Sequence, residues 1–544
     1  MADSEDSGRL YWNYIAFCCL YSTAHGAVDA VLAYSTTELG ELIGSNGGAG
    51  LYICYTASAF FFAKPILRRL GSRNSIFCGL CGMLLYVASF LLALQNPAYS
   101  NSIFTTGGIL GGLGAGLLWP AQGAYFSTSA IKYAAQTDDN TGYAIVLFAS
   151  TFSGIYLGLE TIFKAFATFV YLLLGANSSW HMLVFGSYTV AAYCSVVAFG
   201  IFLPAILKSE RLEVELLSRQ TRTKNIDTAD GGDRKTHLFR KVAISQHADS
   251  TEFEEHWTNN REKDDLNAKE YLWTNVFHFP DFLTLRCDLI SVTNAIRRDR
   301  ILQFMIPYQV CFGFSACFVG YYVNRNIVAK HIGDGYIGLL TGSSTLCAAL
   351  LSYPFGYISN MSGGRGKWYV MIFGALCFCL SGLAPLLLTD EELANWYLIV
   401  TYYCAHGAAR GCWENTNKAV VAEYFSNEDA RETAFATIYF TSGLSGATGF
   451  YFYKYLKREQ LVWINTLVPL IALMSYHYSD YLFHLNCTST DTDSSSNSNI
   501  STNSSSSSGI SNSKRCSVLN ISTALSDVED QDACITDNSQ RRNH

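Results

Sequence analysis

Long apolar runs separated by short polar stretches dominate the chain. A bilayer core about 30 Å thick takes roughly 20 helical residues to cross. Because backbone groups cannot stay unpaired in lipid, each run of that length predicts a transmembrane α-helix. We therefore expect an all-α membrane protein with twelve transmembrane helices. The expected spans lie near residues 11–34, 49–67, 75–95, 102–127, 142–173, 181–206, 301–324, 334–357, 368–388, 395–419, 433–456 and 462–485.

The fifth run is longer than a bilayer requires. As one straight helix, residues 143–174 would extend about 48 Å at 1.5 Å per residue. Such a helix either protrudes from the membrane or breaks near Glu160 and Lys164, and the pattern leaves both open. Because these two side chains lie four residues apart, we expect a pair at the outer surface or a helix break there.

Two polar segments divide the chain. The serine-rich one cannot bury enough apolar surface to fold, so we expect it to be disordered. The central one is expected to be partly folded, with an amphipathic segment at 209–220 and an aromatic cluster at 273–285. The expected domains are an N-terminus at 1–10, an N-terminal six-helix bundle at 11–206, a central loop at 207–300, a C-terminal six-helix bundle at 301–485 and a tail at 486–544.

Lysine and arginine residues of the short loops gather on one side of the expected membrane. The turn at 67–74 is strongly basic, and a second basic turn precedes the ninth span, whereas the loops at 35–48 and 96–101 carry neither residue type. This bias predicts that both termini and the central loop face the cytoplasm. We expect an integral multi-pass protein, and the sequence does not decide between the plasma membrane and an endomembrane.

Composition narrows the range of functions. Only 15% of the 544 residues are charged, the net charge is -7, and no basic domain is present, so nucleic acid is not an expected partner. The sequence offers no nucleophile–base–acid set and no metal-ligand cluster. We therefore expect no enzyme, no cofactor and no metal site.

The two halves of the chain repeat each other in the same order. The segment starting at Tyr143 aligns without a gap with the segment starting at Phe435, at an offset of 292 residues. Trp119 and Trp413, each shortly after a glycine, align at an offset of 294. Two six-helix halves in parallel repeat, joined by a loop, are the plan of major facilitator transporters.

Several stretches carry a more specific resemblance. The segments LGAGLLWPAQGAYFS, LYICYTASAFFFAKPILRRLGSRNS and GCWENTN resemble the uncoordinated-93-like (ion channel regulatory protein) branch of the major facilitator superfamily. Gly116, Trp119, Gln122 and Gly123 form the most specific element. The resemblance implies the major facilitator fold. It also implies one of three functions: regulation of a potassium channel, chaperoning of membrane receptors, or transport.

The basic turns resemble degenerate forms of the facilitator loop motif that clamps helix ends. On this resemblance, a cytoplasmic gate is expected from Arg68, Arg69, Arg73, Arg365 and Lys367. The alternative is a charge cluster that only sets the topology.

Ionisable residues inside spans are costly, which makes them candidates for a substrate or ion pathway. His25 and Asp29 share one face of the first span, either as a proton or cation site or as a pair reaching the outer interface. A polar stripe along the tenth span recurs every four residues and must face the interior or a cavity. It consists of His406, Arg410, Glu414 and Lys418.

The role of this stripe has two interpretations. Either it belongs to a pathway or gate, or Arg410 and Glu414 pair with each other and only fix the helix. The aromatic and amide groups that repeat between the halves suit a small polar ligand at a central cavity, or they pack helices. They are Trp119, Gln122, Trp413 and Asn415.

Two functions stay open. The first is a secondary transporter that moves a small solute or ion by alternating access. The second is a non-transporting regulator of a potassium channel or a trafficking chaperone for receptors. The expected partners are membrane lipid, an unidentified small solute or ion, and, for the second function, a channel or receptor in the membrane.

Overall fold

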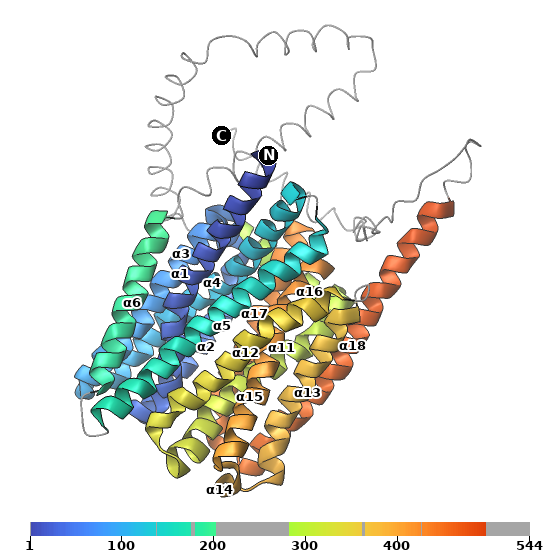
Figure 1. The fold of residues 1–544 in the computed structure, drawn as a ribbon. Helices are drawn as coiled ribbons and strands as arrows, with labels where there is room; N and C mark the ends of the chain where they lie inside the picture. The colour runs from blue at the N-terminus through green and yellow to red at the C-terminus, as the bar shows by residue number, and fades with distance from the viewer. Residues whose placement is uncertain are drawn as a thin grey trace, which may run out of the picture. The chain divides into compact units, whose positions relative to one another are not determined.

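The computed structural model describes residues 2–137, 139–175, 180–202, 282–361, 365–425 and 427–496, and all regular structure in these ranges is helical (Figure 1). The expected all-α class is confirmed. The expected segment at 209–220, most of the aromatic cluster at 273–285 and nearly all of the serine-rich tail lie outside the described residues.

Each of the twelve expected spans coincides with helical structure. The first half contains α1 (Ala2–Glu38), α2 (Glu41–Phe61), α3 (Ala63–Gln95), η1 (Pro97–Tyr99), α4 (Ser100–Thr137), α5 (Thr141–Leu174) and α6 (Trp180–Phe202). The second contains α11 (Arg300–Phe318), η4 (Val319–Ala329), η5 (Asp334–Tyr336), α12 (Ile337–Asn360), α13 (Arg365–Leu387), α14 (Asp390–Leu393), α15 (Trp396–Cys412), η6 (Trp413–Asn417), α16 (Lys418–Tyr424), α17 (Glu428–Phe452), η7 (Tyr453–Tyr455) and α18 (Arg458–Ser496).

Hydropathy alone supports fewer spans than twelve. Within the described residues, nine helices are long and apolar enough to cross a membrane. The remaining three expected spans correspond to α2, to α15 with η6 and α16, and to α17. These helices are rich in glycine, serine, threonine or charged residues, which lie against other helices rather than against lipid.

The expected loop at 35–48 is wrong. Helix α1 continues to Glu38 and α2 already begins at Glu41, with the turn made at Gly40 (φ 83°). The glycine-rich start of α2 is helical because it packs closely on α4. A Cβ added to Gly108 of α4 would lie 2.4 Å from the carbonyl oxygen of Gly47 in α2. Small residues allow this close helix–helix approach, and they also lower the hydropathy.

The fifth span does not break near Glu160. Helix α5 is continuous from Thr141 to Leu174, so of the two expected alternatives, one long helix or a broken one, the long helix holds. It packs along α12, where a Cβ on Gly338 would lie 2.4 Å from the carbonyl oxygen of Lys164. Close contact with α12 supports the helix where the charged residues occur.

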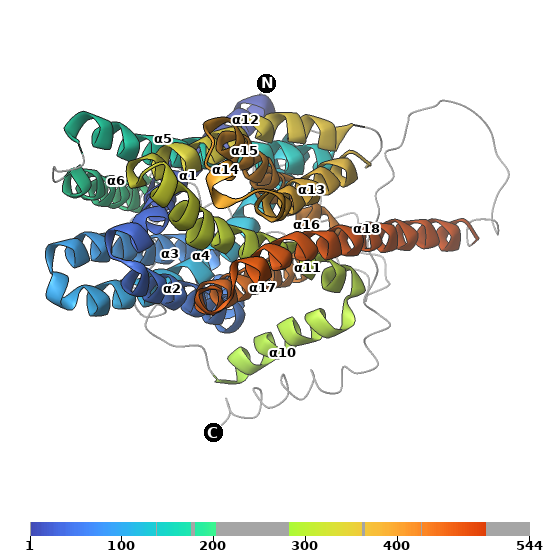
Figure 2. The same ribbon diagram turned by 90° about the horizontal axis from the view of Figure 1, so that it is seen from below.

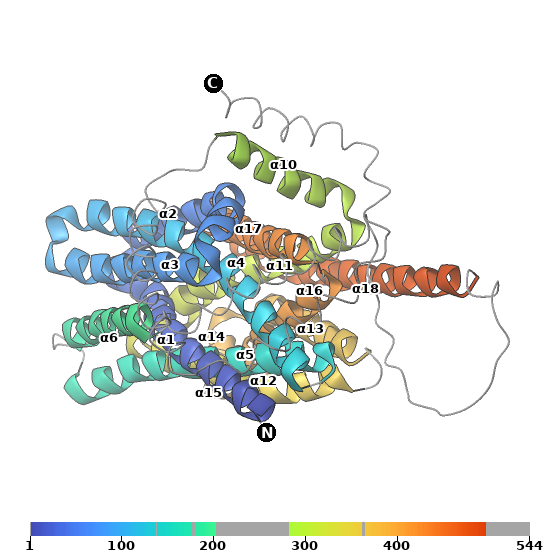
Figure 3. The ribbon, with the colours of Figure 1, turned by 90° about the horizontal axis from the view of Figure 1, so that it is seen from above.

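The two halves meet through equivalent helices. Helix α5, the fifth span of the first half, packs against α12, the second span of the other half. Helix α17, the fifth span of the second half, packs against α2. The views along the bundle show both pairs side by side (Figures 2 and 3). This reciprocal contact agrees with the parallel repeat.

The last part of the expected central loop is a helix, α10 (Phe282–Arg298). It contacts α17 of the second half and α2 and α3 of the first half. In Figure 2 it lies at the edge of the helices, beside α17 and α11.

Two π-helical segments interrupt the second half. One is η4, which follows α11, and the other is η6, which joins α15 to α16 within the tenth span. Single π-turns inside α-helices often occur at functional sites. Segment η6 contains Glu414 and lies between Arg410 and Lys418, so it is part of the polar stripe expected from the sequence.

Candidate functional site

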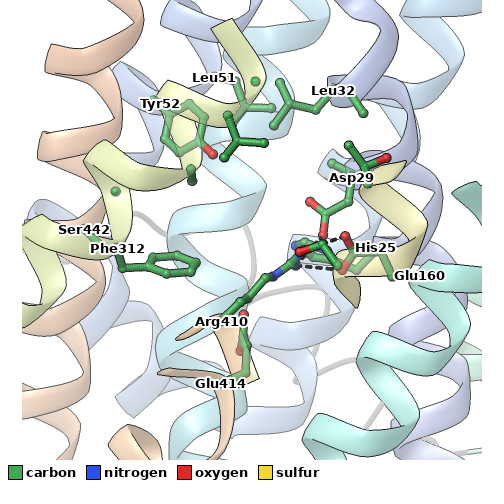
Figure 4. Close-up of a pocket in the computed structure, with 18 of the residues that line it drawn as sticks. His25, Asp29, Leu32, Leu51, Tyr52, Glu160, Phe312, Arg410, Glu414 and Ser442 are labelled. Carbon is green, nitrogen blue, oxygen red and sulfur yellow. Dashed lines mark hydrogen bonds and ion pairs between the residues drawn. The ribbon is translucent and has the colours of Figure 1, made fainter. Parts of the chain in front are cut away.

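A cavity of about 180 Å³ lies between the two halves. A water molecule needs about 10–15 Å³ on the same measure, so the cavity has room for several waters or a small solute. Figure 4 shows side chains from both halves directed into it. Of the nine residues expected for a pathway, seven line the cavity: His25, Asp29, Trp119, His406, Arg410, Trp413 and Glu414.

The Arg410 side chain of α15 crosses from the second half to the first. Its two terminal nitrogens donate to the two carboxylate oxygens of Glu160 in α5, each at 2.6 Å. The Glu160 side chain has no exposed surface, and that of Arg410 is 14% exposed. A paired fork of this kind is the strongest arginine–carboxylate geometry. The alternative in which Arg410 and Glu414 pair with each other is therefore wrong.

Asp29 of α1 is the second acidic partner of this arginine. Arg410 donates to its carboxylate at 3.2 Å, and the Tyr156 hydroxyl donates to the same oxygen at 2.8 Å. His25, one turn earlier on α1, places its Nδ1 3.5 Å from that carboxylate oxygen and 3.2 Å from the Tyr156 hydroxyl. The pair expected from the first span is thus buried inside the bundle, not at an outer interface.

Lys164 completes the network on α5. Its ammonium pairs with the same Glu160 oxygen that accepts from Arg410. Both side chains are buried, which contradicts the expected surface pair. A carboxylate shared by two cations inside a membrane protein is compensated for its burial, whereas a single charge there would not be.

The polar stripe of the tenth span faces the interior along its whole length. His406 is buried, and its Nδ1 lies 3.2 Å from the Ser344 hydroxyl of α12. Glu414 and Lys418 are buried and form an ion pair at 2.6 Å, without the alignment of a hydrogen bond. The stripe therefore divides into two charge pairs, one within the tenth span and one across the halves.

The Lys418 ammonium sits in an aromatic cage. It lies 4.5 Å from the ring centre of Trp119, 4.6 Å from that of Phe152 and 5.9 Å from that of Trp413. Trp119 and Phe152 belong to the first half. Aromatic faces attract cations, especially where water is excluded. The cage is thus a second contact in which a cation of the second half is held by the first.

The two repeated tryptophans approach each other around one tyrosine. Trp119 stacks on Tyr439 with ring centres 5.6 Å apart, and Trp413 meets the same ring edge-on at 6.0 Å. The Trp413 indole nitrogen donates to Gln309 at 2.8 Å. The two repeated tryptophans thus share one aromatic partner, which they meet in different orientations.

Neither of the two expected amides lines the cavity. Asn415 donates to the Ser352 carbonyl at 2.6 Å and accepts from the Ser150 hydroxyl at 3.3 Å, which joins α12 and α5 to η6. Gln122 is fully buried, and neither its amide nitrogen nor its oxygen has a hydrogen-bond partner among the described residues. Asn415 thus joins helices within the interface, whereas the structure shows no interaction that accounts for Gln122.

A clamp joins the two halves at their basic end, the end that carries Arg68. Lys64 of α3 pairs with Asp429 of α17 at 3.1 Å and donates to Thr433 at 2.9 Å, and Arg68 pairs with the same aspartate. Burial raises the pKa of Asp429, but the two cations outweigh it and hold that pKa below its ordinary value. Arg68 in this clamp is one of the residues expected for the cytoplasmic gate.

Three of the other expected gate residues, Lys367, Arg365 and Arg73, show no contact of this kind among the described residues. Lys367 pairs with Glu423, and both belong to the second half. Arg365 is exposed at the start of α13, and Arg73 buries an Nε that has no partner in the described structure. For Arg69 the structure gives a partly exposed side chain near the break of α3 at Gly71 (φ 74°).

Contacts between the halves also occur at the opposite end. Glu41 of α2 pairs with Arg325 and accepts from the Tyr321 hydroxyl at 3.0 Å, both in η4. The Gly338 amide of α12 donates to the Tyr34 hydroxyl of α1 at 3.0 Å. The cavity thus lies between two sets of contacts that join the halves.

Sequence reasoning missed Tyr156, Glu160 and Lys164 as site residues. The available signal was the presence of two charges four residues apart within an apolar run. The excess length of that run favoured a position outside the membrane. Only the packing of α5 on α12 and η6, together with the hydrogen bond from Arg410, shows that this face is internal.

Two family models match separate parts of the chain. The model of the ion channel regulatory protein UNC-93 matches residues 39–240, and that of the Major Facilitator Superfamily matches residues 305–478. Together they confirm the resemblance drawn from the sequence. Among curated proteins, no sequence matches the chain significantly.

Solved structures with a similar arrangement include sugar transporters. The proton:xylose symporter XylE bound to 6-bromo-6-deoxy-D-glucose is 13% identical, with 87% of this chain and 94% of that chain covered and a TM-score of 0.49. The fucose:proton symporter FucP of E. coli is 14% identical, with coverages of 86% and 97% and a TM-score of 0.46. XylE from E. coli in a partially occluded inward open conformation is 12% identical, with coverages of 86% and 95% and a TM-score of 0.49.

Proposed function

We propose that this major facilitator protein of the UNC-93-like branch is a secondary transporter that moves a small solute by alternating access. The observation that supports it is the Arg410–Glu160 pair, which crosses between the halves at the wall of a cavity. Buried ion pairs often stabilise a protein no better than apolar side chains of similar volume, so stability alone does not account for these charges. Charges that meet across the two halves instead suit a site whose halves separate and rejoin.

The two sets of end contacts support the same mechanism. In a parallel-repeat transporter, one half rocks against the other around a central site. The clamp at Asp429 and the pair between Glu41 and Arg325 lie at opposite ends, so breaking one set leaves the other available to hold the halves. We place the Asp429 clamp on the cytoplasmic side, with both termini, because the basic turns favour that orientation.

Transport is tested with purified protein in liposomes. The vesicles are incubated with a mixture of metabolites, and their contents are compared by mass spectrometry with those of protein-free vesicles. We expect at least one solute to enter faster, Arg410→Ala to abolish the difference, and Arg458→Ala to retain it. Arg458 is a matched control because it pairs with Asp390 inside the second half. Equal uptake with and without protein across the mixture would contradict transport.

A second candidate function is regulation or trafficking of another membrane protein. It is favoured by the match of residues 39–240 to the ion channel regulatory protein family. Affinity capture in mild detergent should then return a channel or receptor in a fixed ratio. Capture of no such partner, together with measurable transport, would exclude this alternative.

A further inference from the structure

The charged residues that line the cavity, taken together with Lys418 as the partner of Glu414, are divided unequally between the halves. The first half contributes two carboxylates and one ammonium, and with neutral histidines its net charge is -1; these are Asp29, Glu160 and Lys164. The second half contributes one carboxylate and two cations, a net charge of +1; these are Glu414, Arg410 and Lys418. These two charges compensate each other only while the halves are in contact.

The two members of the central pair differ in what remains when the halves separate. Glu160 keeps Lys164, which lies four residues away on the same helix. Arg410 keeps no such partner. Its hydrogen-bond and ion-pair partners among the described residues, Glu160, Asp29 and Tyr156, all belong to the first half. The nearest acidic residue on its own helix, Glu414, is already paired with Lys418.

An unpaired cation inside a membrane protein is strongly unfavourable. Separation of the halves therefore requires an anion on Arg410. Its planar fork already holds a carboxylate through two parallel hydrogen bonds, so another carboxylate can replace Glu160 with the same geometry. The net charge of +1 on this half is neutralised by a single negative charge.

The first half, with its net charge of -1, requires one positive charge when the halves separate. When Arg410 leaves, Asp29 retains the Tyr156 hydroxyl and the His25 imidazole as partners. A proton on His25 turns that contact into an ion pair and neutralises this half. The other titratable or charged groups that face the pair lie on α1, α2, α3, α5 and α15: Tyr21, Tyr52, Tyr86, Tyr156, Glu160, Lys164 and Arg410. Among them only Lys164 is a remaining cation, and Glu160 occupies it.

We propose that the solute is a small monocarboxylate, that it binds Arg410 in place of Glu160, and that it moves together with one proton held by His25 and Asp29. This inference rests on the proposed transport function. The balance is simple: one negative solute and one proton enter, no bond of the solute changes, and no net charge crosses the membrane. Both leave on the other side, where Glu160 and Asp29 bind Arg410 again.

The binding part is tested on purified full-length protein in detergent, by its thermal stability. The probes are a panel of small carboxylates such as benzoate and lactate, each compared with its amide and with an amine of the same shape, such as benzamide and benzylammonium. We expect at least one carboxylate to stabilise the protein, and its amide and amine to have no effect. If no carboxylate stabilises the protein, or if only amines or amides do, the inference is wrong.

Variants separate binding from folding. Arg410→Gln should weaken the best carboxylate tenfold or more, because it removes two charge-assisted hydrogen bonds. Since this variant leaves buried acids unpaired, Arg410→Gln combined with Glu160→Gln is the second variant. It leaves Asp29 and Lys164 as a neutral set, and we expect it to fold without binding. Arg458→Gln should bind as the unchanged protein does. Undiminished binding in a folded Arg410 variant would overturn the assignment.

Proton coupling is tested in liposomes with the same carboxylate in labelled form. We expect an imposed pH gradient, acidic outside, to drive its accumulation, and a membrane potential alone to have no effect. His25→Gln should abolish the accumulation while exchange of labelled for unlabelled solute continues. Accumulation driven by potential would overturn the proton part. Binding of a carboxylate without any flux would refute transport but leave the anion site, whereas flux of neutral or cationic solutes alone would refute the anion site and leave transport.

Discussion

Arg410 and Glu160 lie 250 residues apart in the chain and form two hydrogen bonds of 2.6 Å across the boundary between the halves. Because both groups are largely withdrawn from water, removing one leaves the charge of the other less well compensated. The pair therefore couples the stability of the contact between the halves to the state of the cavity.

Removing one charge of this pair should destabilise the protein more than removing both. Glu160→Gln leaves Arg410 and Lys164 without their shared anion, so we expect a loss of about 3–5 kcal/mol in the free energy of unfolding. Adding Arg410→Gln should recover part of this loss, because Lys164 then faces Asp29 alone. Thermal unfolding in detergent measures both variants. Equal destabilisation by the single and the double variant would show that the pair does not act as a unit.

For Lys418 in its aromatic cage and its partner Glu414, too, removing one charge should destabilise the protein more than removing both. Lys418→Met leaves Glu414 as a buried, uncompensated carboxylate, and we expect a loss of about 3–5 kcal/mol. Combining it with Glu414→Gln should recover most of this loss. Tryptophan fluorescence provides a local check, because the ammonium lies 4.5 Å from the Trp119 ring. An unchanged emission spectrum in a folded Lys418→Met variant would contradict the cage.

The clamp at the basic end should be modest in energy and should depend on pH in a known direction. Its carboxylate is half exposed, so Asp429→Asn should reduce global stability by less than about 1 kcal/mol. The effect should be local: faster hydrogen exchange at the start of α17 and around Lys64. Glu428→Gln, one residue earlier on the same turn, is the control and should leave exchange near Lys64 unchanged.

The sign of the pH effect follows from the lowered pKa of Asp429. A carboxyl group whose pKa is lower in the folded than in the unfolded protein stabilises the fold above the unfolded value. That stabilisation is lost as the pH falls through the folded value. We therefore expect the exchange difference between Asp429→Asn and the unchanged protein to be constant near neutral pH and to vanish in acid. A difference that grows on acidification would contradict the clamp.

The glycine contact between α2 and α4 should tolerate no side chain. Gly108→Ala places a methyl group 2.4 Å from a backbone oxygen, and we expect a loss of about 1–3 kcal/mol in the free energy of unfolding. Gly158→Ala in α5 is the matched control, since nothing lies within 4 Å of an added Cβ there. It should be neutral or stabilising by about 0.5–1 kcal/mol, because alanine is the better helix former. Equal effects of the two substitutions would argue against close helix packing at Gly108.

Much of the architecture follows from the sequence, because backbone groups cannot stay unpaired in lipid and charged side chains are costly there. The apolar runs predict the helices, and the spacing of four residues predicts that His406, Arg410 and Glu414 share an interior face. The partners of that face do not follow from the sequence. A spacing of four residues also allowed a pair between Arg410 and Glu414, whereas the structure gives each a different partner.

The errors have one physical origin. Hydropathy identifies helices whose side chains favour lipid, but several helices of this protein contact mainly other helices. The polar, glycine-rich start of α2 predicts a loop, and the long run around Glu160 predicts a surface position. In both places a neighbouring helix, α4 or α12, replaces lipid as the environment.

The reciprocal packing of α5 on α12 and α17 on α2 has a consequence for the history of the chain. It is the geometry of an isologous dimer, in which one surface contacts its own copy around a two-fold axis. In a dimer of two identical copies, a charge pair such as that of Arg410 and Glu160 would occur twice, once on each side of the axis. At an offset of 294 residues Arg410 corresponds to Gly116, and at 292 Glu160 corresponds to Phe452. With Gly116 and Phe452 at the equivalent positions, the single chain carries this charge pair on one side of the axis alone.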